Sequence, residues 1–340
     1  MTPTSKLEFG YGPVLRLAVA ICLAAAAPTT IAAEAFGLSL QSDNDEYAGF
    51  NQRDRWYSNG ARATLTQVAE RDGWRARMLA AWCDRLAQCA ADATPAAMFA
   101  IGQNIYTQND RTLSVPLAHD RPIAGWLYLA AGALQDGDDA RDAVQWQLGV
   151  TGPAAYGEQT QNLIHDALGV DRAPTWRYQL RPRLGVNLHV ERNRRIGLGS
   201  HLDAVGHVSA SLGNILTQLS VGAMLRLGWG LRGAVCPSEA MLTAGDGHEP
   251  RGVSLHAGFR LSAVAYNAFL DGRSFGNVSQ VRHRPFVGEL FVGVGIPWHE
   301  RGSLRITIAR RSIEFQGPGV DAAHFSPQTY GQIALTWRLP

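Results

Sequence analysis

Apolar residues recur at every second position in one segment of this chain after another. In residues 178–191, leucine and valine alternate with arginine, asparagine, histidine and glutamate. The same period of two runs through 219–229, 289–296 and 332–339. Because successive side chains of a β-strand point to opposite faces, this pattern predicts strands that each have one apolar face.

Twelve segments of this kind are spread along the chain from residue 36 to residue 339. We expect strands at residues 36–43, 57–67, 97–107, 124–135, 144–151, 178–191, 199–211, 215–228, 253–270, 286–297, 302–314 and 328–339. An even number of antiparallel strands can close into a barrel that has both ends of the chain on the same side. The pattern therefore predicts an all-β fold, a twelve-stranded antiparallel β-barrel.

The polar faces of these strands carry arginine, glutamate, histidine and asparagine. A soluble β-sandwich would expose such faces to bulk water, whereas a membrane barrel turns its apolar faces to lipid and its polar faces to the lumen. Tryptophans stand near the predicted strand ends and are expected to form the interfacial aromatic girdle: Trp126, Trp176, Trp229, Trp298 and Trp337. These features favour a transmembrane barrel over a secreted soluble β-protein.

Composition excludes several other classes of protein. Of the 340 residues, 46% are hydrophobic and 18% are charged, which is too apolar for a disordered chain. The longest apolar run, residues 17–27, is shorter than the roughly 20 residues that a membrane-spanning helix needs. The net charge of +2 gives no indication of a nucleic-acid partner.

The N-terminus has the organisation of a secretory signal peptide. Lys6 and Arg16 precede the apolar run 17–27, and small alanines follow it. A membrane anchor is the alternative, but the run is too short to span a bilayer. We expect a signal peptide at 1–33 and one barrel domain at 34–340, located in the outer membrane of a Gram-negative bacterium.

Strand parity assigns the connections to sides of the membrane. Those after the first, third and fifth strands, at about 44–56, 108–123 and 152–177, are expected to be extracellular. The long connection 68–96 is then periplasmic, and its apolar residues have helical spacing.

Three cysteines remain in the expected mature chain. Cys83 and Cys89 are six residues apart in the connection 68–96, and an oxidising compartment would permit a local disulfide between them. Cys236 has no obvious partner in the sequence.

Oxygen-bearing side chains gather at the first extracellular strand end, in Asp43, Asn44, Asp45 and Glu46. Carboxylate and amide oxygens are the ligands that Ca²⁺ prefers. The alternative is an ordinary turn, because Asp and Asn are common turn residues.

A second candidate lies in the segment 152–168. Gln161 and His165 are four residues apart and would share one face of a helix, beside an apolar stripe that could pack on the barrel. The alternative is that His165 is only a polar surface residue. Parity places His165 on the same side of the membrane as Asn44 and Asp45. A histidine base beside a hard cation could activate water for attack on an ester, with the cation stabilising the oxyanion.

Several motifs together resemble the outer-membrane lipid A 3'-O-deacylase family, in order along the chain from Asn44 onward. They are Asn44-Asp45, Asp54-Arg55-Trp56-Tyr57-Ser58-Asn59-Gly60, Gly102-Gln103-Asn104-Ile105-Tyr106-Thr107, Asp120-Arg121-Pro122, Ala124-Gly125-Trp126, Gly152-Pro153, Gly157-Glu158, Gln161-Asn162, His165, Ser211-Leu212-Gly213-Asn214, Thr217, Leu270-Asp271-Gly272, Phe275 and Glu314-Phe315.

The resemblance implies an active site between the barrel wall and a short helix from an extracellular loop. It implies a Ca²⁺-dependent carboxylic ester hydrolase that removes the 3'-acyloxyacyl chain of lipid A, with lipopolysaccharide and outer-membrane lipids as partners. We expect the barrel to be a monomer. His165 would be the general base, and Asn44 and Asp45 would hold the metal. Ser58 replaces the usual Thr and keeps its hydroxyl, and Gln161 would orient substrate or water.

Two other functions remain open from the sequence. One is an outer-membrane phospholipase with a serine nucleophile, for which Ser58 and Ser114 are the extracellular candidates. The other is a passive pore or binding barrel, in which the same polar residues only decorate loops.

Overall fold

The computed structural model describes residues 36–48, 55–68, 77, 94–110, 112–169, 171–233, 251–298, 301–320 and 325–338. The predicted signal peptide lies outside these residues, as do the cysteines and the predicted helical part of the connection 68–96, apart from residue 77. Within the described segments, no helix is both long enough and apolar enough to cross a membrane.

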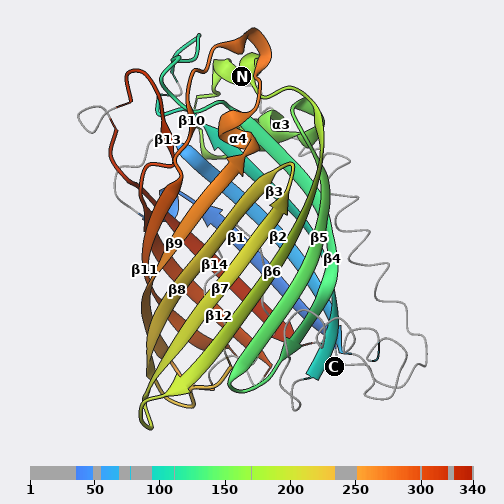
Figure 1. Ribbon diagram of the computed structural model, residues 1–340, viewed down its shortest axis with the longest axis vertical. Coiled ribbons are helices and arrows are strands. Elements are labelled where there is room, and N and C mark those ends of the chain that lie inside the picture. The colour runs from blue at the N-terminus through green and yellow to red at the C-terminus, as the bar shows by residue number, and fades with distance from the viewer. Residues whose placement is uncertain are drawn as a thin grey trace, which may run out of the picture. The chain divides into compact units, whose positions relative to one another are not determined.

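Twelve strands of the described chain form one closed antiparallel barrel (Figure 1). They are β1 (Phe36–Asn44), β2 (Trp56–Val68), β3 (Thr94–Thr107), β4 (Ala124–Asp136), β5 (Ala140–Thr151), β6 (Arg183–Gly197), β7 (Leu202–Gly213), β8 (Leu216–Gly228), β9 (Ser254–Asn267), β11 (Phe286–Trp298), β12 (Gly302–Arg311) and β14 (Gln328–Arg338). Each strand pairs with the next barrel strand along the chain, and β1 closes the wall against β14. The predicted fold class is confirmed.

Short elements fill the connections at one end of the barrel, which strand parity makes the extracellular end. They are η1 (Glu46–Ala48), η2 (Pro153–Ala155), α3 (Gly157–Leu168), η3 (Pro174–Tyr178), α4 (Ala268–Asp271), η5 (Phe275–Asn277), β10 (Arg282–His283) and β13 (Phe315–Gln316). Figure 1 shows α3, α4, β10 and β13 together above the strand ends. The pairing of β10 with β13 joins two of these connections.

Strand ends differ from the prediction where side chains impose another backbone shape. The sixth strand begins at Arg183 instead of 178, because the preceding residues form η3 and Pro182 follows them. The ninth strand ends at Asn267, whose side-chain Oδ1 accepts a hydrogen bond from the backbone N–H of Phe269 at 3.0 Å and so begins α4.

The two faces of the wall have the expected opposite character. Large apolar side chains on the outer face are exposed, among them Leu129, Leu148, Leu184, Leu212 and Leu290. Charged side chains on the inner face are buried, among them Arg62, Arg141, Arg260 and Arg311. This is the arrangement of a barrel that is surrounded by lipid.

Hydrogen-bonded side chains fill the lumen. Arg62 on β2 reaches across to Gln145 on β5, where its Nη2 donates to Oε1 at 2.8 Å. The buried carboxylate of Glu289 accepts hydrogen bonds from three side chains, Arg260 (2.9 Å), Arg311 (2.8 Å) and Tyr330 (2.7 Å). A lumen packed in this way is part of the barrel's core.

The predicted aromatic girdle is correct in part. Trp229 and Trp298 are 65% and 53% exposed, as expected of interfacial residues. For Trp126 and Trp176 the prediction is wrong, because both are buried. Trp126 points into the lumen and stacks on Tyr128, with ring centroids 5.8 Å apart. Trp176 lies in the 3₁₀ helix η3 and not on a strand.

Candidate functional site

Four residues stand in register across the outer face of the wall, close to its extracellular end. Asn44 on β1 pairs with Asn59 on β2, Asn59 with Ile105 on β3, and Ile105 with Gly125 on β4. The positions before and after them on these strands mostly point into the lumen, so this row faces outward.

Helix α3 packs on the same outer face. The Gln103 side chain on β3 donates from Nε2 to the carbonyl of Ala155, just before the helix, at 2.7 Å. A Cβ atom on Gly125 would lie 3.3 Å from Cα of Gly157, the first residue of α3. A Cβ atom on Gly157 would meet the ring of Trp176 at 2.6 Å. Glycine at both positions therefore allows the helix to approach the wall closely.

The ends of α3 explain why the predicted helix forms here. Tyr156 precedes the helix with a left-handed φ of 54°, and Gly169 follows it with a φ of 69°. The Gly169 N–H donates to the carbonyl of His165, which gives the helix a glycine-capped C-terminus.

His165 occupies the last turn of α3 and is buried, with 5% of its surface exposed. Its Nδ1 lies 2.8 Å from the carbonyl oxygen of Asp171. A carbonyl can only accept, so Nδ1 carries the proton of the neutral ring and Nε2 carries the lone pair. The loop that holds Asp171 therefore fixes the orientation of the imidazole ring.

An exposed ion pair closes the same loop. Arg172 Nη2 contacts the carboxylate of Asp166 at 2.5 Å. Asp166 follows His165 and Arg172 follows Asp171, so this ion pair lies beside the His165–Asp171 hydrogen bond. The hydrogen bond from Arg172 lowers the pKa of Asp166 below its usual range. The pair remains charged at neutral pH and adds a second connection across the loop.

Gln161 lies one turn before His165 on the same face of α3. Its Oε1 accepts a hydrogen bond from the indole Nε1 of Trp176 at 2.6 Å, and both side chains are buried. Sequence reasoning missed this role of Trp176, because a tryptophan near an expected strand end suggests an interfacial residue.

Asn44 ends β1 and Asp45 follows it, and the two side chains have different surroundings. The Oδ1 of Asn44 accepts from the backbone N–H of Glu46 at 2.8 Å, and its Nδ2 contacts Oδ1 of Asn59 at 3.4 Å. Asp45 is completely buried, and its Oδ2 accepts from the backbone N–H of Arg55 at 2.8 Å. The turn after β1 therefore ties Asp45 to the beginning of β2.

Ser58 sits in a β-bulge of β2. The pairing with β3 shifts between Tyr57 and Asn59, and the Ser58 hydroxyl donates to the carbonyl of Ile105 at 3.3 Å. Nearby, Trp56 has a positive φ of 59°, which is uncommon for a bulky side chain. An irregular strand end of this kind is frequent beside functional sites.

A buried aspartate from the resemblance motif Asp120-Arg121-Pro122 holds Trp56 in place. The carboxylate of Asp120 accepts from the indole Nε1 of Trp56 at 3.0 Å and from two backbone N–H groups, those of Asn109 (2.6 Å) and Arg121 (2.7 Å). Burial raises the pKa of Asp120 above its usual range. The aspartate lies in a loop with no hydrophobic periodicity, so only its resemblance motif pointed to this segment.

The donor atoms at the end of β1 are oxygens. In the described segments, no group of three or more His, Cys, Asp or Glu side chains could hold a metal ion. Asn44 and Asp45 offer amide and carboxylate oxygens, with the Ser58 hydroxyl and Asn59 amide on the neighbouring strand. Hard oxygen donors suit Ca²⁺ better than they suit zinc, so the residue types fit a calcium site that backbone carbonyls or water would complete.

The family model described as "Outer membrane protein LpxR" matches residues 15–339. The chain belongs to the LpxR family. The family resemblance seen in the sequence is thereby confirmed, as is the location in the outer membrane. No curated protein sequence matches the chain.

The comparison with solved structures gives similarities of different strength. LpxR from Salmonella typhimurium is 20% identical, with a TM-score of 0.69 over 88% of this chain and 99% of that chain. The translocator domain of the autotransporter NalP from Neisseria meningitidis is 10% identical, with a TM-score of 0.42 over 96% of each chain. An outer-membrane channel from Pseudomonas putida F1 is 12% identical, with a TM-score of 0.42 over 92% of this chain and 97% of that chain.

Proposed function

We propose that this protein is a lipid A 3'-O-deacylase, which hydrolyses the 3'-acyloxyacyl ester of lipid A in the outer leaflet with the help of Ca²⁺. Membership of the LpxR family supports a barrel that modifies lipid A. The observation that carries the finer proposal is that α3 and the row from Asn44 to Gly125 lie on the lipid-facing side of the wall.

A site on the outer face can receive a lipid directly from the leaflet. The row stands at the extracellular ends of the strands, where the hydrocarbon region gives way to headgroups, and an ester of lipid A lies at that depth. Because side chains fill the lumen, approach of the lipid from the surrounding leaflet is favoured over approach through the barrel. The barrel closes within one chain, which supports a protein that acts as a monomer.

His165 is the general base of the proposed reaction. Its Nε2 takes a proton from water, and the water oxygen attacks the carbonyl carbon of the ester. The tetrahedral intermediate then breaks its bond to the sugar oxygen, which leaves as a hydroxyl after receiving the proton from His165. The carbonyl of Asp171 stabilises the imidazolium that forms between these steps.

Asn44 and Asp45 are the residues that would hold Ca²⁺ in this proposal. When bound, the cation would supply positive charge for the oxyanion of the intermediate. The bonds from the backbone of Glu46 to Asn44 and from that of Arg55 to Asp45 keep these oxygens at the end of β1.

Gln161 and Ser58 have supporting roles. Trp176 fixes the Gln161 side chain on the face of α3 that carries His165, so that its amide can orient substrate or water. The Ser58 hydroxyl, on the bulge beside Asn59, contributes a polar group near the metal or the oxyanion.

The geometry gives less support to a serine nucleophile. The hydroxyl of Ser58 is 1% exposed and donates to a backbone carbonyl, whereas an activated serine donates to a histidine. Ser114 is exposed in a loop, and its carbonyl accepts from Arg177. A passive pore is also disfavoured, because side chains bridge the lumen between β2 and β5.

Mass spectrometry of lipid A from a host that expresses the full chain tests the proposal. We expect loss of the 3'-acyloxyacyl group with the wild-type protein, and intact lipid A with His165→Ala or after calcium chelation. His201→Ala is the matched control, because His201 lies at the other end of the barrel, in the connection between β6 and β7. Unchanged lipid A in cells that contain correctly inserted wild-type protein would show that the proposal is wrong.

A further inference from the structure

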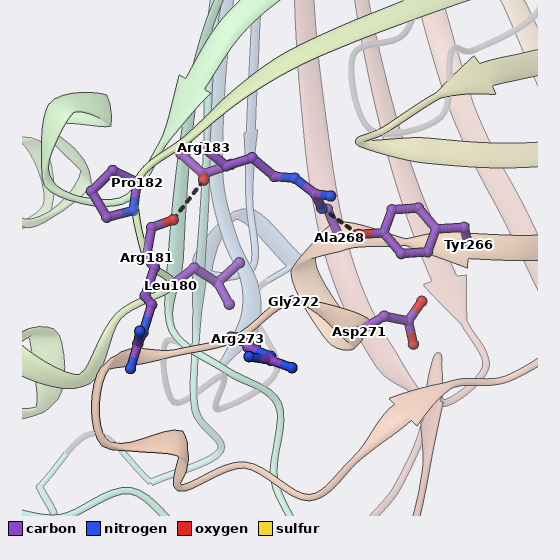
Figure 2. A pocket seen from close by; sticks show the side chains of 10 residues that line it. Leu180, Arg181, Pro182, Arg183, Tyr266, Ala268, Asp271, Gly272 and Arg273 are labelled. Atoms are coloured by element: carbon purple, nitrogen blue, oxygen red, sulfur yellow. Dashed lines mark hydrogen bonds between the residues drawn. The ribbon is translucent and has the colours of Figure 1, made fainter.

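A pocket of about 350 Å³ opens at the extracellular rim, between the end of the β5–β6 connection and the segment that follows β9. Figure 2 shows Arg183 reaching Tyr266 across it, with Arg273 and Asp271 on the opposite side. Its volume lies near the lower end of the range for small-ligand pockets. None of its lining residues belongs to the row on the outer face of β1 to β4.

The rim of the barrel is lower at the β7–β8 hairpin than at the neighbouring strands β6 and β9. Pairing of β6 with β7 ends at Asn187, whereas β6 continues to Arg183, and a two-residue turn at 214–215 joins β7 to β8. The hydrogen bond from Arg183 to the hydroxyl of Tyr266 on β9 therefore passes above the β7–β8 hairpin. The pocket lies in the resulting notch of the rim.

Three arginines line the pocket without a carboxylate partner among the described residues: Arg181, Arg183 and Arg273. The Nε of Arg181 donates to the backbone carbonyl of Ser274 at 3.4 Å, and Arg183 donates to Tyr266. Guanidinium groups held by neutral partners keep their full charge and their planar arrays of donors, which suit phosphate groups.

The one carboxylate in the lining is already bonded. Asp271 accepts from the backbone N–H of Asn267 at 2.8 Å, and from both the backbone N–H (3.0 Å) and the ring Nδ1 (2.7 Å) of His283. The lining therefore keeps an excess of positive charge.

The depth of the pocket in the membrane distinguishes a lipid from a soluble ligand. Leu184 follows Arg183 directly and is 64% exposed on the lipid face. A strand rises about 3.3 Å per residue, so Arg183 stands just above the hydrocarbon boundary. Lipid headgroups carry their phosphates at this level.

We infer that this pocket binds the phosphorylated sugar headgroup of a glycolipid in the outer leaflet. Arg183 and Arg273 hold the phosphate from opposite sides, and Tyr266 fixes Arg183 in place. The inference does not depend on hydrolysis of the lipid, because none of these residues belongs to the proposed ester site.

Native mass spectrometry of the full-length protein in detergent tests the inference. The His165→Ala background prevents turnover and leaves the pocket unaltered. The probes are bisphosphorylated lipid A, its dephosphorylated form, and inorganic phosphate as a competitor. We expect the phosphorylated lipid to remain bound and the dephosphorylated lipid to bind more weakly by about tenfold or more, since hydrogen bonds to charged groups are lost.

The double substitution Arg183→Gln and Arg273→Gln should weaken retention of the phosphorylated lipid by at least about tenfold. Arg251→Gln, at an exposed arginine of the β8–β9 connection, should leave it unchanged. Heat-modifiable migration on gels confirms that each barrel is folded. Equal retention of the two lipids, or unchanged retention in the double variant, would overturn the inference. Binding of inorganic phosphate without binding of the lipid would overturn the assignment to a glycolipid.

Discussion

Trp176 supports the proposed site through a single hydrogen bond. Its indole fixes Gln161, and its ring occupies the space that a side chain on Gly157 would need. No periodic pattern identifies such a residue, because it lies in a short 3₁₀ helix within the connection between α3 and β6. The sequence predicted His165, Gln161, Asn44, Asp45 and Ser58 through residue type and family resemblance, but it could not predict the contacts of a loop tryptophan.

Replacing Trp176 with Phe should keep the ring and remove the donor. The buried Oε1 of Gln161 then loses that bond, and we expect deacylation to fall by about tenfold while the barrel still folds. Trp229→Phe is the control, because Trp229 is exposed at the other end of the barrel. Normal deacylation by the Trp176→Phe variant would show that the mechanism does not depend on the orientation of the Gln161 side chain.

Asp120 makes stability depend on pH in a defined direction. Burial raises the pKa of its carboxyl, so the folded state holds a proton that the unfolded chain releases. The stabilisation that this proton gives the folded state is complete below the ordinary pKa of aspartate. It is lost as the pH rises through the raised pKa of Asp120.

We therefore expect the wild type to lose more stability than Asp120→Asn, which cannot titrate, as the pH rises above the ordinary pKa of aspartate. Urea unfolding midpoints in detergent micelles measure the difference. The reverse slope would mean that the hydrogen bonds to Asp120 outweigh its burial.

At the scale of elements, the strands and the helix α3 were predictable, whereas the packing of the connections on the barrel was not. Alternation identifies a strand because one face meets lipid and the other meets the lumen, and all twelve predicted strands are present. Periodicity gives no information where both faces of a segment are covered. The docking of α3 on the wall depends instead on two glycines, Gly125 and Gly157, that lie far apart in the sequence.

Gly157→Ala tests this docking. The added methyl group would meet the Trp176 ring at 2.6 Å, so the helix or the ring must shift. A displacement of about 1 Å can reduce catalysis by about a hundredfold, and we expect a loss of that order in lipid A deacylation. Gly288→Ala is the control, because its Cβ would meet Leu261 at an ordinary 3.6 Å. Full activity of Gly157→Ala would argue against a closely docked helix.

At the scale of the whole molecule, the barrel is closed and its lumen is filled by charged side chains that compensate one another. The sequence predicted polar side chains inside the barrel, yet it could not say whether they line water or bond to one another. That difference depends on partners from separate strands, such as Arg62 with Gln145 and Arg311 with Glu289.

Arg311→Ala should destabilise the barrel by about 3 kcal/mol, because it removes a buried partner from the Glu289 carboxylate. Its neighbour Arg310 points outward and is exposed, so Arg310→Ala should change the free energy of unfolding by less than about 0.5 kcal/mol. Urea unfolding in detergent measures both variants. Equal effects would mean that the lumen cluster contributes nothing specific to stability.

The position of α3 on the convex surface of the barrel affects how the proposed enzyme would respond to dilution. A site that faces the leaflet meets its substrate by lateral diffusion in two dimensions. The rate then depends on the mole fraction of substrate among the surrounding lipids and not on its amount per volume of buffer. Adding inert lipid to a proteoliposome should slow the reaction, whereas diluting the whole suspension should leave the turnover per protein unchanged.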